Sequence, residues 1–299
     1  MILIALSYLA GIAFVAFVAL RSLRIARMPV HLRWELYPVP HDENAAHGGS
    51  VFENPDWWRV RSTPARAREL GVMMREIFLL AGVREHNPGL WLCSYPFHLG
   101  LYLLVGFIAL LGVGAFTQGF ADAGVVAIAG STTTIVGVSG FALLGAGAAG
   151  LLARRLANPA LRAHSAAADF FNLACFCTLA TIGLAAFVFA DRDFLFLRGF
   201  VRSLLTAESP PELPVLVVVE ILAGLALLVY LPLSHMSHFF TKWFTYHSIR
   251  WDDKANRVGS HLEKQIQRQL GEEVTWAAPH IGGGGGRNWV DVATAETKK

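Results

Sequence analysis

Three histidines, His98, His235 and His238, lie inside long apolar stretches of the chain. Imidazole nitrogen is a strong axial ligand for haem iron, and apolar helices keep water away from the macrocycle. His98 lies near the start of the apolar stretch 94–117, and His238 lies near the end of the stretch 214–240. Two antiparallel membrane helices would bring these two histidines to a similar depth. This pattern indicates one haem held by two imidazoles between the helices of a bundle.

His235 is the alternative ligand from the stretch 214–240, because residues three positions apart share one face of a helix. A histidine within a membrane can also hydrogen-bond a neighbouring backbone carbonyl or line a small polar cavity. Residue type and spacing alone therefore leave both haem binding and a structural role open for His98 and His238.

Five apolar stretches that could position these histidines dominate the composition of the chain. Hydrophobic residues make up 54% of it and charged residues only 16%, whereas a soluble domain usually carries about a quarter charged residues. Each stretch is long enough to cross a membrane as a helix. We therefore predict an all-α polytopic membrane protein, a bundle of five transmembrane helices that holds haem b. The predicted spans are 1–20, 94–117, 129–152, 168–190 and 214–240.

The distribution of basic residues predicts the orientation of the bundle. Nearly all Lys and Arg residues lie in three segments outside the spans, 21–93, 153–167 and 241–299. We expect these segments on the cytoplasmic side of the inner membrane, which leaves the N-terminus outside and the C-terminus inside. The same bias accounts for the net charge of +3 without a nucleic-acid partner.

The predicted organisation is one membrane domain with cytoplasmic extensions. A helical pattern begins at Thr63-Pro64 and carries an apolar stripe, which predicts an amphipathic helix against the membrane surface or a partner. The predicted parts are the first transmembrane helix at 1–20, a cytoplasmic loop with this helix at 21–93, the haem-binding core at 94–240 and a cytoplasmic tail at 241–299.

Two shorter segments are predicted from composition alone. Residues 194–205 alternate apolar side chains with Arg198 and Arg202, a pattern typical of a segment lying flat at the membrane interface. The five glycines at 282–286 are not followed by the Lys and Ser or Thr of a phosphate-binding loop, so a flexible tail is predicted there. Aromatic residues in such a tail often anchor partners. The tryptophans of this tail are Trp243, Trp251, Trp276 and Trp289.

Three motifs resemble the cytochrome b membrane subunit, the gamma subunit, of respiratory nitrate reductase. They are Phe97-His98-Leu99-Gly100, the stretch RLANPALR from Arg155 to Arg162, and Pro232 ahead of His238. Similar subunits occur in the sulfite-reduction-associated and heterodisulfide reductase membrane complexes. The resemblance implies electron exchange between membrane quinone and a cytoplasmic iron–sulfur subunit. The long segment 21–92 favours a partner of the heterodisulfide-reductase type.

The resemblance also implies haem ligands. The family holds two b haems, each between the second and fifth spans, and its inner pair of histidines maps onto His98 and His238. At the positions of the outer pair this chain has Ile108 and Glu220, so we predict a single haem. Arginines of the RLANPALR stretch, Arg155 and Arg162, are candidates for binding the haem propionates. The alternative is that they only follow the inside-positive bias.

Glu220 is the candidate proton relay for a quinone bound where the outer haem is missing. A carboxyl group in low-dielectric surroundings can exchange protons with a quinol, and hydrogen bonding to a neighbouring helix is the alternative role. Asp169, at the inner end of the fourth span, is a second acidic candidate that we interpret as structural. A non-redox membrane anchor or a proton-coupled transporter would use the same polar residues and is the alternative function.

Overall fold

The chain forms two compact units in the computed structural model. The first unit comprises residues 1–17 and 73–236, and the second comprises residues 18–72 and 237–299. The structure describes residues 1–28, 66–117, 122–206, 208–245, 258–278 and 281–295.

Among the described residues, five helices are long and apolar enough to cross a membrane, the fifth counted through its first 3₁₀ turn as Val215–Leu233. They confirm the predicted all-helical membrane fold, although their ends differ from the apolar stretches. The second span begins at Pro88 instead of at 94, because proline is favoured in the first turn of a helix and Asn87 accepts a hydrogen bond from Leu90 N at 3.0 Å. The five are α1 (Ile2–Ala26), α4 (Pro88–Thr117), α5 (Ala123–Ala157), α7 (Ala167–Phe189) and α9 (Val215–Tyr230).

Shorter helices connect or follow these spans. The predicted amphipathic helix corresponds to α2, and its predicted start at Thr63 lies outside the described residues. Most of the predicted cytoplasmic loop and Trp251 of the tail also lie outside them. The shorter helices are α2 (Arg66–Leu79), α3 (Ala81–His86), α6 (Pro159–Ala163), α8 (Leu195–Thr206), α10 (His238–Thr245), α11 (His261–Leu270) and α12 (Trp289–Thr294).

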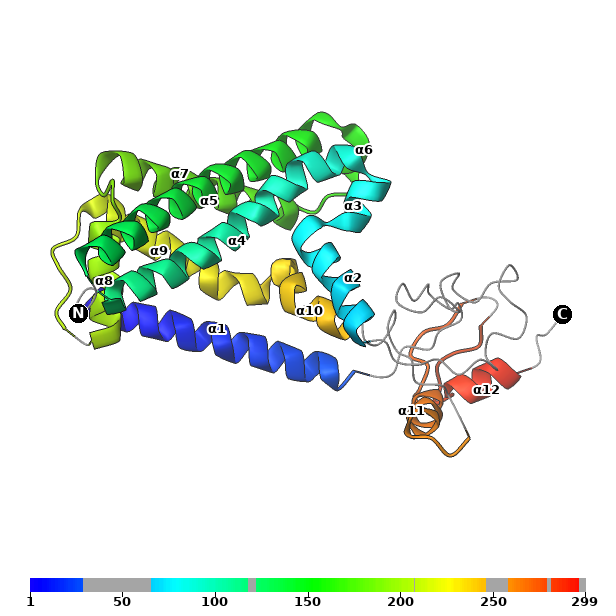
Figure 1. The fold of residues 1–299 in the computed structure, drawn as a ribbon. Helices are drawn as coiled ribbons and strands as arrows, with labels where there is room; N and C mark the ends of the chain where they lie inside the picture. The colour runs from blue at the N-terminus through cyan, green and yellow to red at the C-terminus, as the bar shows by residue number, and fades with distance from the viewer. Residues whose placement is uncertain (29–65, 118–121, 207, 246–257, 279–280, 296–299) are drawn as a thin grey trace. The chain divides into compact units, whose positions relative to one another are not determined.

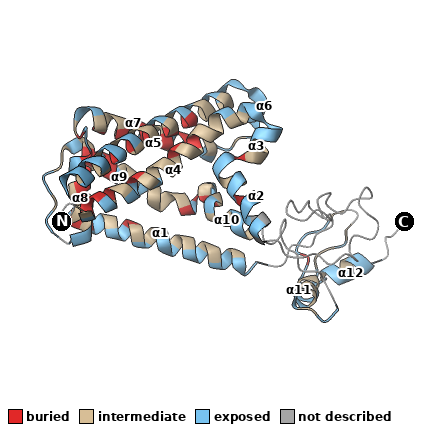
Figure 2. Cartoon of the chain, in the orientation of Figure 1, coloured by how far each residue is buried: buried red, intermediate tan, exposed pale blue. Residues whose placement is uncertain are grey.

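Close packing of α4 against α5 forms the core of the first unit, with α7 beside α5 and α9 beside α7 (Figure 1). Glycines allow the approach of α4 and α5: a Cβ atom on Gly147 would lie only 2.6 Å from Phe97 Cα. Small residues at such contacts let membrane helices pack backbone to backbone. Buried residues concentrate on these inner helices, whereas α1 is largely intermediate or exposed (Figure 2).

The fifth span is interrupted, so the prediction of a continuous helix over 214–240 is wrong. The helix α9 ends at Tyr230, two 3₁₀ turns follow at Leu231–Leu233 and His235–Ser237, and α10 begins at His238. Pro232 has no backbone N–H and cannot continue the helical hydrogen bonds. His235 and His238 therefore do not share the face of one regular helix.

The segment predicted at the membrane interface forms α8, and Arg198 on this helix is buried. Its side chain is 3% exposed, and a Cβ atom on Gly114 would lie 3.0 Å from Arg198 Nε. Gly114 is in the last turn of α4, whose carbonyl groups carry the negative end of the helix dipole. Packing of α8 against this helix end buries the arginine, and the place of this segment at the membrane interface stays a prediction.

The glycine stretch of the second unit is an ordered turn, which contradicts the predicted flexible tail. Three of its residues, Gly284, Gly285 and Gly286, have φ of +85°, +68° and +80°, a region that glycine adopts without a Cβ clash. Gly284 N donates to Val274 O at 2.8 Å, and Gly286 N donates to Glu273 Oε1 at 3.1 Å. The repeated glycines thus allow the left-handed backbone conformation of this turn.

Candidate functional site

His98 lies on α4 with its ring orientation fixed by its own helix. Its Nδ1 is 2.7 Å from the carbonyl oxygen of Ser94, one turn earlier. Because a carbonyl can only accept, Nδ1 carries the proton, and the lone pair is on Nε2. Histidines that bind metals typically donate their other ring N–H to such a partner. The donor chemistry of His98 therefore fits an axial haem ligand.

The neighbours of His98 tie α4 to the rest of the first unit. The preceding residue, Phe97, is buried and packs edge-to-face on Phe176 of α7, with ring centroids 5.0 Å apart. One turn later, Tyr102 donates its hydroxyl proton to Ile77 O of α2 at 2.6 Å. Contacts on both sides of His98 thus hold this part of α4 in place.

His238 is the first residue of α10 and is half-buried. It belongs to the second unit, whereas His98 belongs to the first. The pairing of His98 with His238 across one haem therefore stays a prediction.

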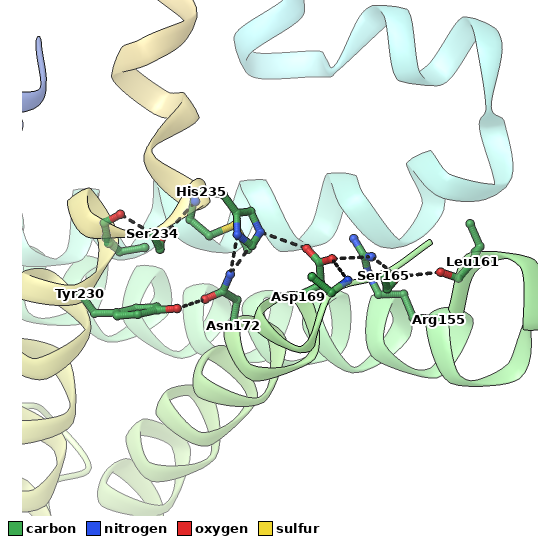
Figure 3. A network of polar contacts seen from close by, with 11 residues as sticks. Arg155, Leu161, Ser165, Asp169, Asn172, Tyr230, Ser234 and His235 are labelled. Atoms are coloured by element: carbon green, nitrogen blue, oxygen red, sulfur yellow. Dashed lines mark hydrogen bonds and ion pairs between the residues drawn. The ribbon is translucent and has the colours of Figure 1, made fainter. Parts of the chain in front are cut away.

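His235, the alternative ligand, is part of a polar network between α7 and the interrupted fifth span (Figure 3). Its Nε2 lies 3.1 Å from Asp169 Oδ1. Asn172 Nδ2 lies 3.2 Å from Nε2 and 3.4 Å from Nδ1, and Tyr230 donates to Asn172 Oδ1 at 2.6 Å. Both ring nitrogens of His235 thus have protein partners. Iron binding by His235 would cost one of these contacts.

The RLANPALR motif forms the end of α5 and the start of α6. Asn158 Oδ1 accepts hydrogen bonds from Ala160 N at 2.9 Å and Leu161 N at 3.2 Å, and Asn-Pro is a sequence that caps one helix and begins the next. The motif is therefore explained in part by backbone structure. The motif therefore predicts the junction between the two helices, whether or not it also binds a cofactor.

The two arginines predicted to bind propionates occupy different surroundings. Arg155 donates to Ser165 Oγ at 2.7 Å and lies 3.7 Å from Asp169 Oδ2, so Asp169 links it to the polar contacts of His235. Asp169 also accepts a hydrogen bond from Ala166 N at 2.8 Å and so caps α7. Arg162 is exposed on α6. Propionate binding by either arginine stays a prediction.

Glu220 lies at the other end of the first unit, near α8, and is 6% exposed. Its carboxyl is close enough to Asp191 for the two like charges to interact. Asp191 is 5% exposed, and its Oδ2 accepts a hydrogen bond from Leu197 N at 2.9 Å. Sequence reasoning missed Asp191, because its position directly after the fourth span is equally typical of a surface loop.

Ile108 and Glu220, at the positions of the family's outer haem ligands, differ in their exposure. Ile108 is 65% exposed on α4, whereas Glu220 is buried on α9. Within the described residues there is no cluster of three or more His, Cys, Asp or Glu side chains that could hold a metal ion.

Comparison with known proteins gives one family. A family model described as nitrate reductase gamma subunit matches residues 85–252, which is more than half of the chain. The match includes α4 to α10 and thus all the residues of the candidate site. No curated protein matches the chain.

Proposed function

This chain belongs to the nitrate reductase gamma subunit family, and on that premise we propose that it passes electrons between membrane quinone and a cytoplasmic iron–sulfur subunit through one haem b. The family consists of membrane cytochrome b-type electron-transfer subunits of redox enzyme complexes, and five apolar helices make this chain a multi-pass membrane protein. We place it in the inner membrane with the N-terminus outside and the C-terminus in the cytoplasm.

The observation that carries the proposal is the tautomer of His98, which is set by its hydrogen bond to Ser94 O. With Nδ1 donating to Ser94 O at 2.7 Å, the imidazole presents Nε2 as its basic nitrogen. His98 and His238 would hold the haem, and Arg155 and Arg162 would neutralise its propionates. When bound, haem b supplies a one-electron centre whose potential depends on the axial ligands and the surrounding polarity. The helix α4 would orient His98 and exclude water from it.

Haem content tests this function directly. We expect one haem b per chain in the purified protein, measured by the pyridine haemochrome method. The reason is that Ile108 offers no nitrogen ligand where the family has its outer haem, and a carboxyl at Glu220 replaces the opposing imidazole. Two haems per chain would contradict the single-haem assignment. A haem-free protein would instead favour the membrane anchor or proton-coupled transporter.

Quinone exchange is proposed at the end of the unit that contains Glu220. A buried carboxyl beside a second carboxyl, here Asp191, is suited to holding and releasing a proton. Oxidation of a quinol releases protons together with electrons, so a proton acceptor is needed near its hydroxyl groups. Glu220 would receive the proton, and the nearby carboxyl of Asp191 would influence how readily Glu220 binds it.

Replacing Glu220 by glutamine is expected to slow quinol-linked haem reduction by about 100-fold, the range typical of a lost general acid–base group. The rate would be measured by stopped-flow absorbance with a soluble quinol analogue. Glu212→Gln is the matched control, because Glu212 is an exposed carboxyl that precedes the same helix, and it should leave the rate unchanged. A wild-type rate in Glu220→Gln would show that Glu220 is no relay.

The proposed partner is an iron–sulfur subunit of the heterodisulfide-reductase type, bound on the cytoplasmic side. The described part of the tail has three exposed tryptophans, Trp243, Trp276 and Trp289. Trp276 and Trp289 are suited to such a contact as a pair, because their ring centroids lie 6.4 Å apart. Because the glycine turn next to them is ordered, they are presented from a folded segment. The other proposed partners are the lipid bilayer and membrane quinone.

A further inference from the structure

A surface cavity lies in the first unit at the corner where α2 is followed by α3 (Figure 1). The chain reverses there through Leu80, whose φ of +49° is left-handed. The cavity has a volume of about 360 Å³, and its lining residues are Arg75, Leu79, Ala81, Arg84 and Glu85. None of these residues takes part in the proposed electron transfer.

Trp91 of α4 holds both sides of this cavity in place. Its indole Nε1–H donates to Leu79 O at 2.8 Å, and the guanidinium carbon of Arg84 lies 5.4 Å from the centroid of its ring, a cation–π contact. Tyr95, one turn later, stacks on Trp91 with ring centroids 4.7 Å apart. The cavity is therefore fixed to the first turns of a helix that is long and apolar enough to cross a membrane.

Two guanidinium groups, those of Arg75 and Arg84, supply positive charge to the cavity. Both side chains are exposed, and among the described residues neither forms an ion pair. Glu85 contributes one carboxylate to the lining, so the lining residues together carry a net charge of +1. The N–H groups of a guanidinium match the geometry of a phosphate or carboxylate. The cavity is therefore suited to a phosphate group.

Exposed apolar side chains of α2 lie beside the charged lining. Leu79 lines the cavity itself and is 45% exposed, and Met74 and Phe78 are 37% and 52% exposed. Met74 and Phe78 share one face of α2, because they are four residues apart. A free phosphate would gain nothing from these side chains, whereas the hydrocarbon chains of a lipid would cover them. Trp91 and Tyr95 are residue types that belong at the level of lipid headgroups.

We propose that this cavity binds the headgroup of an anionic phospholipid, with the phosphate on Arg75 and Arg84 and the acyl chains along the exposed apolar side chains of α2. The net positive charge of the lining favours an anionic headgroup over a zwitterionic one, whose cationic group would be repelled by the arginines. The bound lipid would fasten the corner between α2 and α3 to the bilayer surface. The proposal does not depend on haem binding or quinone exchange.

Lipid retention by the full chain tests the proposal. The purified protein is reconstituted in nanodiscs with equal amounts of phosphatidylglycerol and phosphatidylcholine, and the lipids that stay bound after release are counted by native mass spectrometry. We expect the wild-type protein to retain phosphatidylglycerol in preference, and its apparent affinity to fall by about 10-fold or more in Arg75→Gln/Arg84→Gln. Equal retention of the two lipids by the wild-type protein, or an unchanged affinity in this double variant, would overturn the proposal.

Arg24→Gln/Arg27→Gln is the matched control, because it removes the same charge from two exposed arginines at the end of α1 and leaves the cavity intact. It should keep the wild-type preference, and an equal loss here would show that general surface charge, and not the cavity, attracts the lipid. Glu85→Gln removes the negative charge of the lining and should strengthen the preference for phosphatidylglycerol. A weaker preference in that variant would contradict the proposed charge match. All the replaced side chains are exposed, so no variant removes a buried side chain.

Discussion

Replacing His98 by alanine is expected to abolish the low-spin b-type absorption of the purified protein completely. The imidazole with Nδ1 bound to Ser94 O is the axial ligand in our proposal, and alanine has no atom that can coordinate iron. His238→Ala should have the same effect, because low-spin haem b needs both axial nitrogens. The measurement is the reduced-minus-oxidised spectrum together with the haem-to-protein ratio.

His235→Ala serves as the matched control for this pair. Its imidazole is bound to Asp169 and Asn172, so its loss should leave the haem spectrum in place. Each variant is checked for a monodisperse profile in size-exclusion chromatography, which separates ligand loss from misfolding. An unchanged spectrum in well-folded His98→Ala, or a lost spectrum in His235→Ala only, would reject the assignment of His98 and His238.

Replacing Gly100 by alanine is expected to lower the thermal unfolding midpoint by about 5–10 °C. The added Cβ would lie 2.8 Å from Leu144 Cα and 2.9 Å from Gly140 O. These are backbone atoms of α5, so no side-chain rotation relieves the clash, and α4 and α5 must move apart. Because His98 lies one half-turn away on α4, haem retention should fall as well. Differential scanning fluorimetry and the haem ratio measure the two effects.

Gly112→Ala on the same helix is the control for Gly100→Ala. Nothing lies within 4 Å of a Cβ atom at Gly112, and alanine is favoured over glycine within helices by about 1 kcal/mol. Its unfolding midpoint should therefore stay the same or rise slightly. Equal midpoints for the two variants would show that α4 and α5 do not pack as closely as in this structure.

Local composition was enough to predict the number of spans and their approximate positions. Apolar stretches of membrane-spanning length stand out from the sequence without knowledge of any contact, and α4, α5 and α7 include all or nearly all of the predicted ranges 94–117, 129–152 and 168–190. The family was also predictable, because its motifs are local: Asn158-Pro159 forms a helix junction, and Pro232 interrupts a helix.

Predictions failed where hydropathy and backbone chemistry disagree. The range 214–240 is apolar throughout except for a few residues, which predicted one helix, but Pro232 cannot supply a backbone N–H and the helix stops at Tyr230. The glycines at 282–286 were interpreted by composition as flexible. Their N–H groups nevertheless find acceptors at Val274 and Glu273, which orders the turn.

The pattern of residue types along the chain thus determined the spans, the family and the histidines worth testing. Which polar side chains meet was decided only by the tertiary structure: His235 with Asp169, Glu220 with Asp191, and Arg198 with the last turn of α4. The physical reason is that hydropathy and helix capping act between neighbours in the chain. These pairs depend instead on how each helix is rotated and how closely its glycines let it approach the next, which is fixed by packing between distant segments.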